Sequence, residues 1–177
     1  PNGQYKDAMN VQVSTSEGSD VGTVQNVLGN YSLGGLNGDC VGSIADEKNN
    51  KLYWFITTST KDAIYEYNEG LSPIPIFIDT KTNTPEAVLE FGARIITGIN
   101  IVDDFLFWTD GVTEPKKINI TRSKLGTVDA FTHTKLVVEG VVAQEDDGSG
   151  VFVDIDIKKE HITVIKKKPT NKLNVKL

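Results

Sequence analysis

Apolar residues in this chain come in short runs that alternate with polar residues and are separated by turn-forming residues. The runs are rich in Val, Ile, Tyr and Phe, which favour strands. Few stretches repeat apolar residues at the i, i+3, i+4, i+7 spacing of an amphipathic helix. The pattern therefore predicts an all-β chain. The expected strands span residues 9–14, 21–28, 40–45, 51–57, 63–67, 74–78, 94–102, 105–109, 116–120, 135–139, 151–157 and 161–166.

The segments between these strands carry residues that favour turns. Residues 46–50 form a polar hairpin loop, and Asp103 with Asp104 makes a two-residue connection. The one candidate helix spans residues 85–91, where Thr84 is a suitable cap and Pro85 suits the first turn. The chain thus reads as hairpins joined by short loops.

Two parts of the chain, residues 41–79 and 97–139, form similar units of four expected strands. Each unit has a Gly in its first strand and an aromatic pair ending in Trp in its second. Trp54 and Trp108 are 54 residues apart, and Ile64 and Ile118 each follow their Trp by ten residues. A four-stranded antiparallel repeat of about 40–55 residues is typical of a β-propeller blade. The alternative is a pair of unrelated hairpins with a chance Trp spacing.

The blade interpretation explains the Gly in each first strand by the crowding of strands near the propeller axis. It assigns the aromatic residues to packing between neighbouring blades, with both Trp side chains buried at equivalent places. Each unit is expected to form a four-stranded antiparallel sheet. The expected structural core of the blades consists of Tyr53, Trp54, Phe105, Phe107, Trp108, Thr109 and Asp110. The predicted organisation is an N-terminal hairpin segment (1–39), a first blade-like unit (40–93), a second (94–150) and the Lys-rich start of a further β unit (151–177).

Composition narrows the class of protein. The chain has 177 residues, with 24 acidic and 18 basic side chains and a net charge of −6. A dedicated nucleic-acid binder usually carries the opposite sign. The single cysteine, Cys40, excludes a disulfide framework within the chain and a cysteine zinc site. We expect Cys40 to be a small buried residue of the first strand rather than a reactive thiol.

The C-terminal region has the opposite charge from the rest of the chain. Residues 158–177 contain seven Lys and one Glu. A solvated strand explains this composition, and a contact with an acidic neighbouring subunit or with DNA is the alternative. The candidate basic contact surface consists of Lys158, Lys159, Lys166, Lys167, Lys168 and Lys172.

Groups able to carry catalysis or bind a metal are few and scattered. The acidic loop at residues 145–150 and the nearby Asp154 and Asp156 offer oxygen ligands, but the Asp-x-Asp-x-Asp-Gly spacing of a calcium loop is absent. His133 and His161 fall in different elements without a nucleophile motif, so each is expected to be a surface or capping residue. We therefore expect no enzyme activity, no metal and no cofactor.

Two families resemble parts of this chain. The segment Phe107-Trp108-Thr109-Asp110 resembles the Tyr-Trp-Thr-Asp signature of the propeller in LDL-receptor-like proteins. In that family the Trp fills the space between blades, while Thr and Asp bond to backbone and tie blades together. The first unit lacks the Thr-Asp pair, and the cysteine-rich modules of that family are absent from this sequence. This resemblance therefore extends to the blade and not to receptor function.

A resemblance to tail proteins of short-tailed phages runs nearly end to end. These are the stabilisation, nozzle or muzzle proteins, including those of crAss-like phages. The similar segments, in the same order, are residues 2–11, 17–30, 41–55, 96–110, 114–120 and 160–169. The resemblance implies a structural virion protein of the tail, present in six copies beneath the portal and its adaptor ring. It also implies that packaged DNA passes through the centre without sequence-specific binding.

Two blades do not close a propeller, which needs four or more. We therefore expect the chain to be the N-terminal part of a longer one, located in the virion, with no membrane contact. An alternative is an extracellular or periplasmic propeller that binds a protein or glycan ligand. A propeller hydrolase is a third hypothesis, supported only by the acidic loop.

Overall fold

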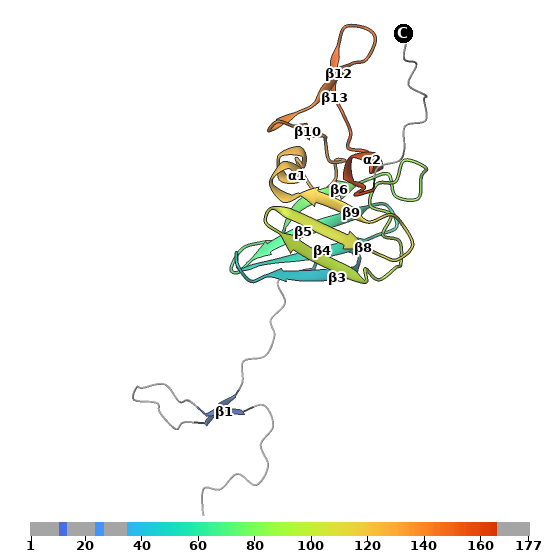
Figure 1. The fold of residues 1–177 in the computed structure, drawn as a ribbon. Coiled ribbons are helices and arrows are strands. Elements are labelled where there is room, and N and C mark those ends of the chain that lie inside the picture. The colour runs from blue at the N-terminus through green and yellow to red at the C-terminus, as the bar shows by residue number, and fades with distance from the viewer. Residues whose placement is uncertain (1–10, 14–23, 27–34, 166–177) are drawn as a thin grey trace, which may run out of the picture. The chain divides into compact units, whose positions relative to one another are not determined.

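The computed structural model describes residues 11–13, 24–26 and 35–165 (Figure 1). The chain divides into two compact units, Pro1–Gly35 and Leu36–Leu177. In the first unit, strands β1 (Val11–Val13) and β2 (Val24–Asn26) pair antiparallel. These strands lie within two of the expected ones. The predicted all-β class is confirmed at the coarse level, because the structure is mostly β and its sheets are antiparallel.

The first sheet is four-stranded, as the repeat predicts. It consists of β3 (Asp39–Asp46), β4 (Lys51–Thr57), β5 (Asp62–Asn68) and β6 (Ile74–Asp79), paired antiparallel in chain order. The hairpin loop after β3 closes because the Asp46 carboxylate accepts hydrogen bonds from Asn49, while Asn50 takes a positive φ of 52°. Local turn chemistry and strand alternation agree here, so the sheet follows the sequence closely.

The second sheet has three strands, so the prediction of four was wrong. It consists of β7 (Gly98–Val102), β8 (Phe105–Thr109) and β9 (Lys116–Asn119). After β9 the chain enters helix α1 (Ile120–Gly126), because Asn119 caps it by accepting a hydrogen bond from the Arg122 amide. The helix takes the chain away from the edge of β9 before the expected fourth strand begins.

The residues expected to form that fourth strand pair elsewhere. The Thr134 amide donates to the Ile78 carbonyl at 2.9 Å, so this part of the chain lies along the outer edge of the first sheet. Beyond it, β10 (Val137–Val138) pairs with β11 (Val141–Val142) in a separate hairpin. A further hairpin of β12 (Gln144–Asp146) and β13 (Phe152–Asp154) projects from the body (Figure 1).

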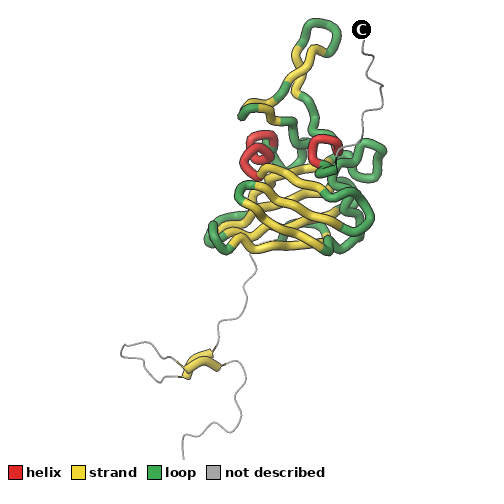
Figure 2. The backbone as a smooth tube through the Cα atoms, viewed as in Figure 1, coloured by secondary structure: helices red, strands yellow, loops and turns green. Residues whose placement is uncertain are grey.

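Two expected elements were wrong. No strand forms over residues 161–165, the described part of the strand predicted at 161–166, and helix α2 (Lys159–Ile162) occupies its beginning. The helix predicted at residues 85–91 is replaced by turns, because the amides of Val88 and Leu89 bond to the Asp79 carboxylate instead of to helical carbonyls. Both helices lie on one side of the two sheets (Figure 2).

The main core lies between the two sheets. Its buried residues come from both sheets, from the connection between them and from the two helices. A smaller cluster covers the other face of the first sheet, where Ile56, Ala63, Tyr65 and Ile78 are buried. The cluster in which an aromatic side chain packs shows on which face of its sheet that side chain lies.

Candidate functional site

The two sheets pack face to face through aromatic side chains. Trp108 of β8 meets Phe55 of β4 edge-on, with ring centroids 5.6 Å apart, and meets Phe91 in the same manner at 6.3 Å. Trp108 is 4% exposed and Phe55 is fully buried. Such edge-to-face pairs are favourable beyond the apolar area they bury. The predicted burial of Trp108 between two sheets is confirmed.

The first strands of the two sheets approach each other most closely. The Ile96 amide donates to the Val41 carbonyl at 2.8 Å. A Cβ added to Gly42 would lie 3.0 Å from the Cβ of Ile96 and 2.9 Å from the end of Ile99. Gly42 is therefore needed for this approach, in agreement with the expectation that the first strand carries Gly because strands crowd there.

The strand register defines which residues of the two sheets are equivalent. Phe55 lies opposite Gly42, and Thr109 lies opposite Gly98. Trp54 and Trp108 are the preceding residues and are therefore equivalent, as the repeat predicts. In the third strand the alignment was wrong, because Ile64 lies opposite Phe55 whereas Ile118 lies opposite Leu106. The shared ten-residue spacing is thus a coincidence.

The equivalent tryptophans point in the same direction along the stack of sheets. Trp108 lies in the core between the sheets, whereas Trp54 packs with the cluster on the far face of the first sheet. If a two-fold axis related the two sheets, equivalent residues would meet at the interface. These sheets are instead stacked head to tail. The Trp108 side of the second sheet contacts the first sheet, and the Trp54 side of the first sheet points away from the second.

The remaining residues assigned to the blade core occupy different environments. Tyr53 is buried between the sheets, whereas Trp54 is only half-buried and stacks on Tyr67 at 5.5 Å. Phe105 is 39% exposed and Phe107 is half-buried, because both point away from the first sheet. The expected burial in the core was therefore wrong for Trp54, Phe105 and Phe107, and Trp54 is not buried like its equivalent Trp108.

Asp110 organises the loop after β8. Its carboxylate accepts hydrogen bonds from the amides of Val112 and Thr113 at 2.9 and 2.7 Å, and lies 3.6 Å from Arg94. Burial would raise the pKa of Asp110, but these hydrogen bonds outweigh it and hold the pKa below its usual value. Thr109 accepts from the Gly111 amide. Asp110 thus bonds to backbone, as the resemblance implies, and joins its loop to the connection between the sheets.

The outward faces of the two sheets are only partly covered. Directly opposite residues of antiparallel strands share a face. The Trp54 face, on the first sheet, is buried at Ile56, Ala63, Tyr65 and Ile78, and it is exposed or half-buried along Cys40, Ser43, Ala45, Leu52, Trp54 and Tyr67. The Phe107 face, on the second sheet, is exposed or half-buried along Gly98, Asn100, Val102, Phe105, Phe107 and Lys117. The expectation of a buried Cys40 was wrong, because the thiol lies on an open face.

A buried carboxylate joins the first sheet to helix α1. Glu66 is 2% exposed and accepts hydrogen bonds from Lys124 of α1 at 2.6 and 2.7 Å and from the Tyr53 hydroxyl at 2.9 Å. Burial alone would raise the pKa of Glu66, but Lys124, Tyr53 and Lys51 outweigh it and lower the pKa. Burial and the bond to Glu66 raise the pKa of Tyr53. The ionised carboxylate is thus the form that this site stabilises.

We expect the stabilisation from Glu66 to disappear in acid. Because its folded pKa is lowered, the contribution is present above its ordinary pKa of 4.5 and is lost as pH falls through the folded value. Urea unfolding of Glu66→Gln should show a free energy of unfolding lower by about 2 kcal/mol at pH 7, with the deficit shrinking below pH 4.5. The exposed change Glu47→Gln is the control. A deficit that is constant with pH would contradict this assignment.

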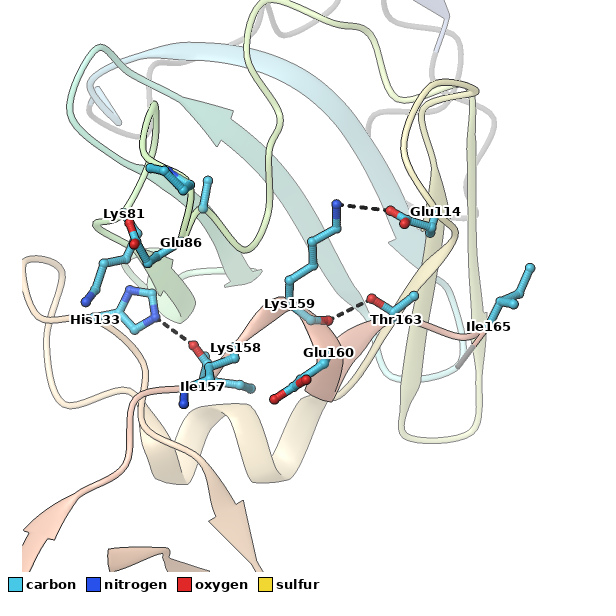
Figure 3. A pocket seen from close by; sticks show the side chains of 12 residues that line it. Lys81, Glu86, Glu114, His133, Ile157, Lys158, Lys159, Glu160, Thr163 and Ile165 are labelled. Atoms are coloured by element: carbon cyan, nitrogen blue, oxygen red, sulfur yellow. Dashed lines mark hydrogen bonds and ion pairs between the residues drawn. The ribbon is translucent and has the colours of Figure 1, made fainter. Parts of the chain in front are cut away.

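A cavity of about 510 Å³ lies beside helix α2 (Figure 3). His133 in its wall accepts from the Thr80 amide at Nδ1, at 3.2 Å, and Nε2 lies 3.0 Å from the Ile157 carbonyl, to which it donates. Both ring nitrogens are therefore used by backbone. His161 likewise accepts from the Lys158 amide at 3.0 Å and caps α2. The expectation of a surface or capping histidine is confirmed for His161 and was wrong for His133, which is buried and bonds to loop backbone away from either helix end.

The candidate basic surface is only partly described. Lys166, Lys167, Lys168 and Lys172 lie outside the described residues. Lys158 is exposed, whereas Lys159 forms an ion pair with Glu90 at 2.8 Å. Lys159 also pairs with Glu114 at 3.0 Å (Figure 3). The hydrogen bond to Glu90 is the main cause of the raised pKa of Lys159. Lys159 thus binds acidic groups of its own unit.

Acidic residues gather at two places on the described part of the chain. In the 145–150 loop, Asp146 accepts from the amides of Gly148 and Gly150 and so closes its own turn. A groove of about 580 Å³ runs between the β3–β4 and β7–β8 turns and is lined by Asp46, Glu47, Asp103 and Asp104. Among the described residues, no group of three or more His, Cys, Asp or Glu side chains is arranged to hold a metal ion.

No family model, curated protein or solved structure matches this chain. No helix in the described ranges has the length and apolar character needed to span a membrane.

Proposed function

We propose that this chain is a structural protein of a short-tailed phage tail, of the nozzle or muzzle type, built from propeller-like blades. Its role would be mechanical, with no catalysis. Copies would surround the DNA exit channel next to the portal and its adaptor ring and help to retain packaged DNA. The tail assignment is supported by the ordered resemblance of six segments of the sequence to that family.

The observation that carries the architectural part of the proposal is the head-to-tail stacking of the two sheets. Propeller blades repeat by rotation about one axis, so equivalent residues face the same way in every blade. Trp54 and Trp108 have this relation. The first strands, β3 and β7, also approach most closely at Gly42, as the innermost strands of a propeller do.

The charge of the described surface is compatible with a channel that DNA passes. The groove between the β3–β4 and β7–β8 turns is rich in carboxylates. A carboxylate-rich wall repels phosphates, which limits sticking of DNA during ejection.

The virion role is tested on purified particles. We expect peptides of this protein in the particles at six copies per portal ring, and a native mass for the full-length protein that corresponds to a closed ring. A soluble monomer that never associates with particles would contradict the virion role.

The second candidate function is a secreted module that binds a protein or glycan. The observation that favours it is the half-buried Trp54 stacked on Tyr67 at an open face, since exposed aromatic pairs can stack on sugars. Saturable binding of a glycan that is lost in Trp54→Ala, together with absence from particles, would favour this function over the virion role.

A further inference from the structure

We propose that the Trp54 face of one copy of this chain docks on the Phe107 face of a second copy. The new interface would repeat the one that already joins the two sheets. The inference rests on the head-to-tail stacking within the proposed function and does not depend on the phage assignment. Its occupant is a second copy because the two open faces are the counterparts of each other.

The interface between the two sheets supplies the template. There, the first sheet contributes Tyr53 and Phe55, and the second contributes Leu106 and Trp108. The register makes Phe107 equivalent to Tyr53, and makes Leu52 and Trp54 equivalent to Leu106 and Trp108. The Phe107 face therefore corresponds to the side of the first sheet that carries Tyr53. The Trp54 face corresponds to the side of the second sheet that carries Trp108.

Both faces carry apolar groups that this packing would cover. Val102 is 50% exposed and Phe105 is 39% exposed on the Phe107 face. On the Trp54 face, Leu52, Trp54 and Tyr67 are half-buried. Contiguous apolar residues on an open sheet face mark an interaction surface in a soluble protein.

The close approach that the template needs is also available on the Phe107 face. Gly98 is equivalent to Gly42, and the atom nearest to an added Cβ at Gly98 is a methyl of Thr109 on the adjacent strand, at 3.2 Å. Among the described residues, none from another sheet approaches Gly98 within 4 Å of that position, whereas Ile96 and Ile99 approach Gly42. Ile96 lies two residues before Gly98, and Cys40 lies two residues before Gly42 with a β-bulge between them, so Cys40 of a second copy would lie near this place.

A disulfide tests this arrangement directly. In the template, the Cβ of Ile96 is 3.0 Å from an added Cβ at Gly42. The equivalent pair across two copies is Cys40 and residue 98. A disulfide needs a Cβ separation of about 3.5–4.5 Å, which is slightly longer than in the template, so a small outward shift of the two strands would allow the bond. We expect Gly98→Cys to form reducible dimers and larger species under mild oxidation. Ser149→Cys, on the exposed β12–β13 loop, is the matched control and should give at least tenfold less cross-linking through Cys40.

Two measurements keep the test decisive if Gly98→Cys does not fold. Labelling of Cys40 in the unaltered chain should slow severalfold as protein concentration rises, because docking covers the thiol. Phe107→Asp should abolish this protection, whereas Phe131→Asp, on an exposed loop, should retain it.

Concentration-independent labelling, or cross-linking of Gly98→Cys no greater than that of Ser149→Cys, would overturn the proposed interface. Either result would leave the virion role to be judged separately by its presence in particles.

Discussion

Replacing Trp108 with Ala is expected to lower the free energy of unfolding by about 3–5 kcal/mol, the usual cost of truncating a packed Trp. Trp108 is 4% exposed and contacts Phe55 and Phe91, so its removal leaves a cavity between the two sheets. The surrounding rings of Phe55 and Phe91 belong to the first sheet and to the connection between the sheets, so the cavity cannot close without moving these elements. Urea unfolding followed by circular dichroism measures the effect.

Trp54→Ala is the matched control for this prediction. It removes the same side chain at the equivalent place in the other sheet, but Trp54 is half-buried and its Tyr67 partner is also partly exposed. Its cost in the isolated chain should therefore be well below that of Trp108→Ala. Equal losses for the two variants would contradict the head-to-tail stacking, in which only one Trp side is covered within the chain.

Replacing Asp79 with Ala is expected to lower the free energy of unfolding by at least about 3 kcal/mol. The fully buried carboxylate accepts the amides of Val88 and Leu89 at 2.7 and 2.8 Å and the Lys81 amide at 2.9 Å. Val88 and Leu89 are 1% exposed, so the change leaves two buried donors unpaired, each costing about 1–3 kcal/mol. Urea unfolding at pH 7 measures the loss.

Asp129→Ala is the control that distinguishes the effect of burying the carboxylate from the effect of the number of hydrogen bonds it accepts. Asp129 also accepts two backbone amides, from Phe131 and Thr132 at 2.7 Å each, but it lies at the exposed tip of a loop where water replaces the lost acceptor. Its effect should be much smaller. Asp79→Asn, which keeps one acceptor oxygen, should fall between the two. A loss in Asp79→Ala no larger than in Asp129→Ala would show that the 85–91 segment is held by its apolar side chains alone.

The first sheet could be predicted almost completely because its information is local. Strand alternation, the polar loop at residues 46–50 and the short connections all favour the same four strands. The second unit departed from the pattern at Asn119, whose side chain caps a helix that strand patterning alone does not reveal. The segment at residues 85–91 failed for the opposite reason. Its cap and Pro85 favour a helix, but the carboxylate of Asp79, nine and ten residues earlier, binds the amides of Val88 and Leu89 instead.

The equivalence of the two tryptophans could be predicted from the sequence, but the face of the sheet that each side chain occupies could not. The sequence correctly pairs Trp54 with Trp108 as equivalent residues. Whether each of the two equivalent residues is buried depends on whether another sheet packs on its face. The sequence spacing of the two tryptophans carries no information about this. Phe105 reads as a core aromatic for the same reason, and it lies on the open Phe107 face. The close approach at Gly42 was predicted, whereas the exposure of Cys40 on the facing side of the same strand was not.

An experimental structure of the full-length protein in its assembled state tests the central claim most directly. The account predicts that another antiparallel sheet covers Trp54 and that every sheet presents its Trp side in the same rotational sense. It also predicts that the first strands, including β3 and β7, lie nearest the axis. A structure in which Trp54 faces solvent, or in which the two sheets form a closed two-layer sandwich with no further sheet on either open face, would contradict it.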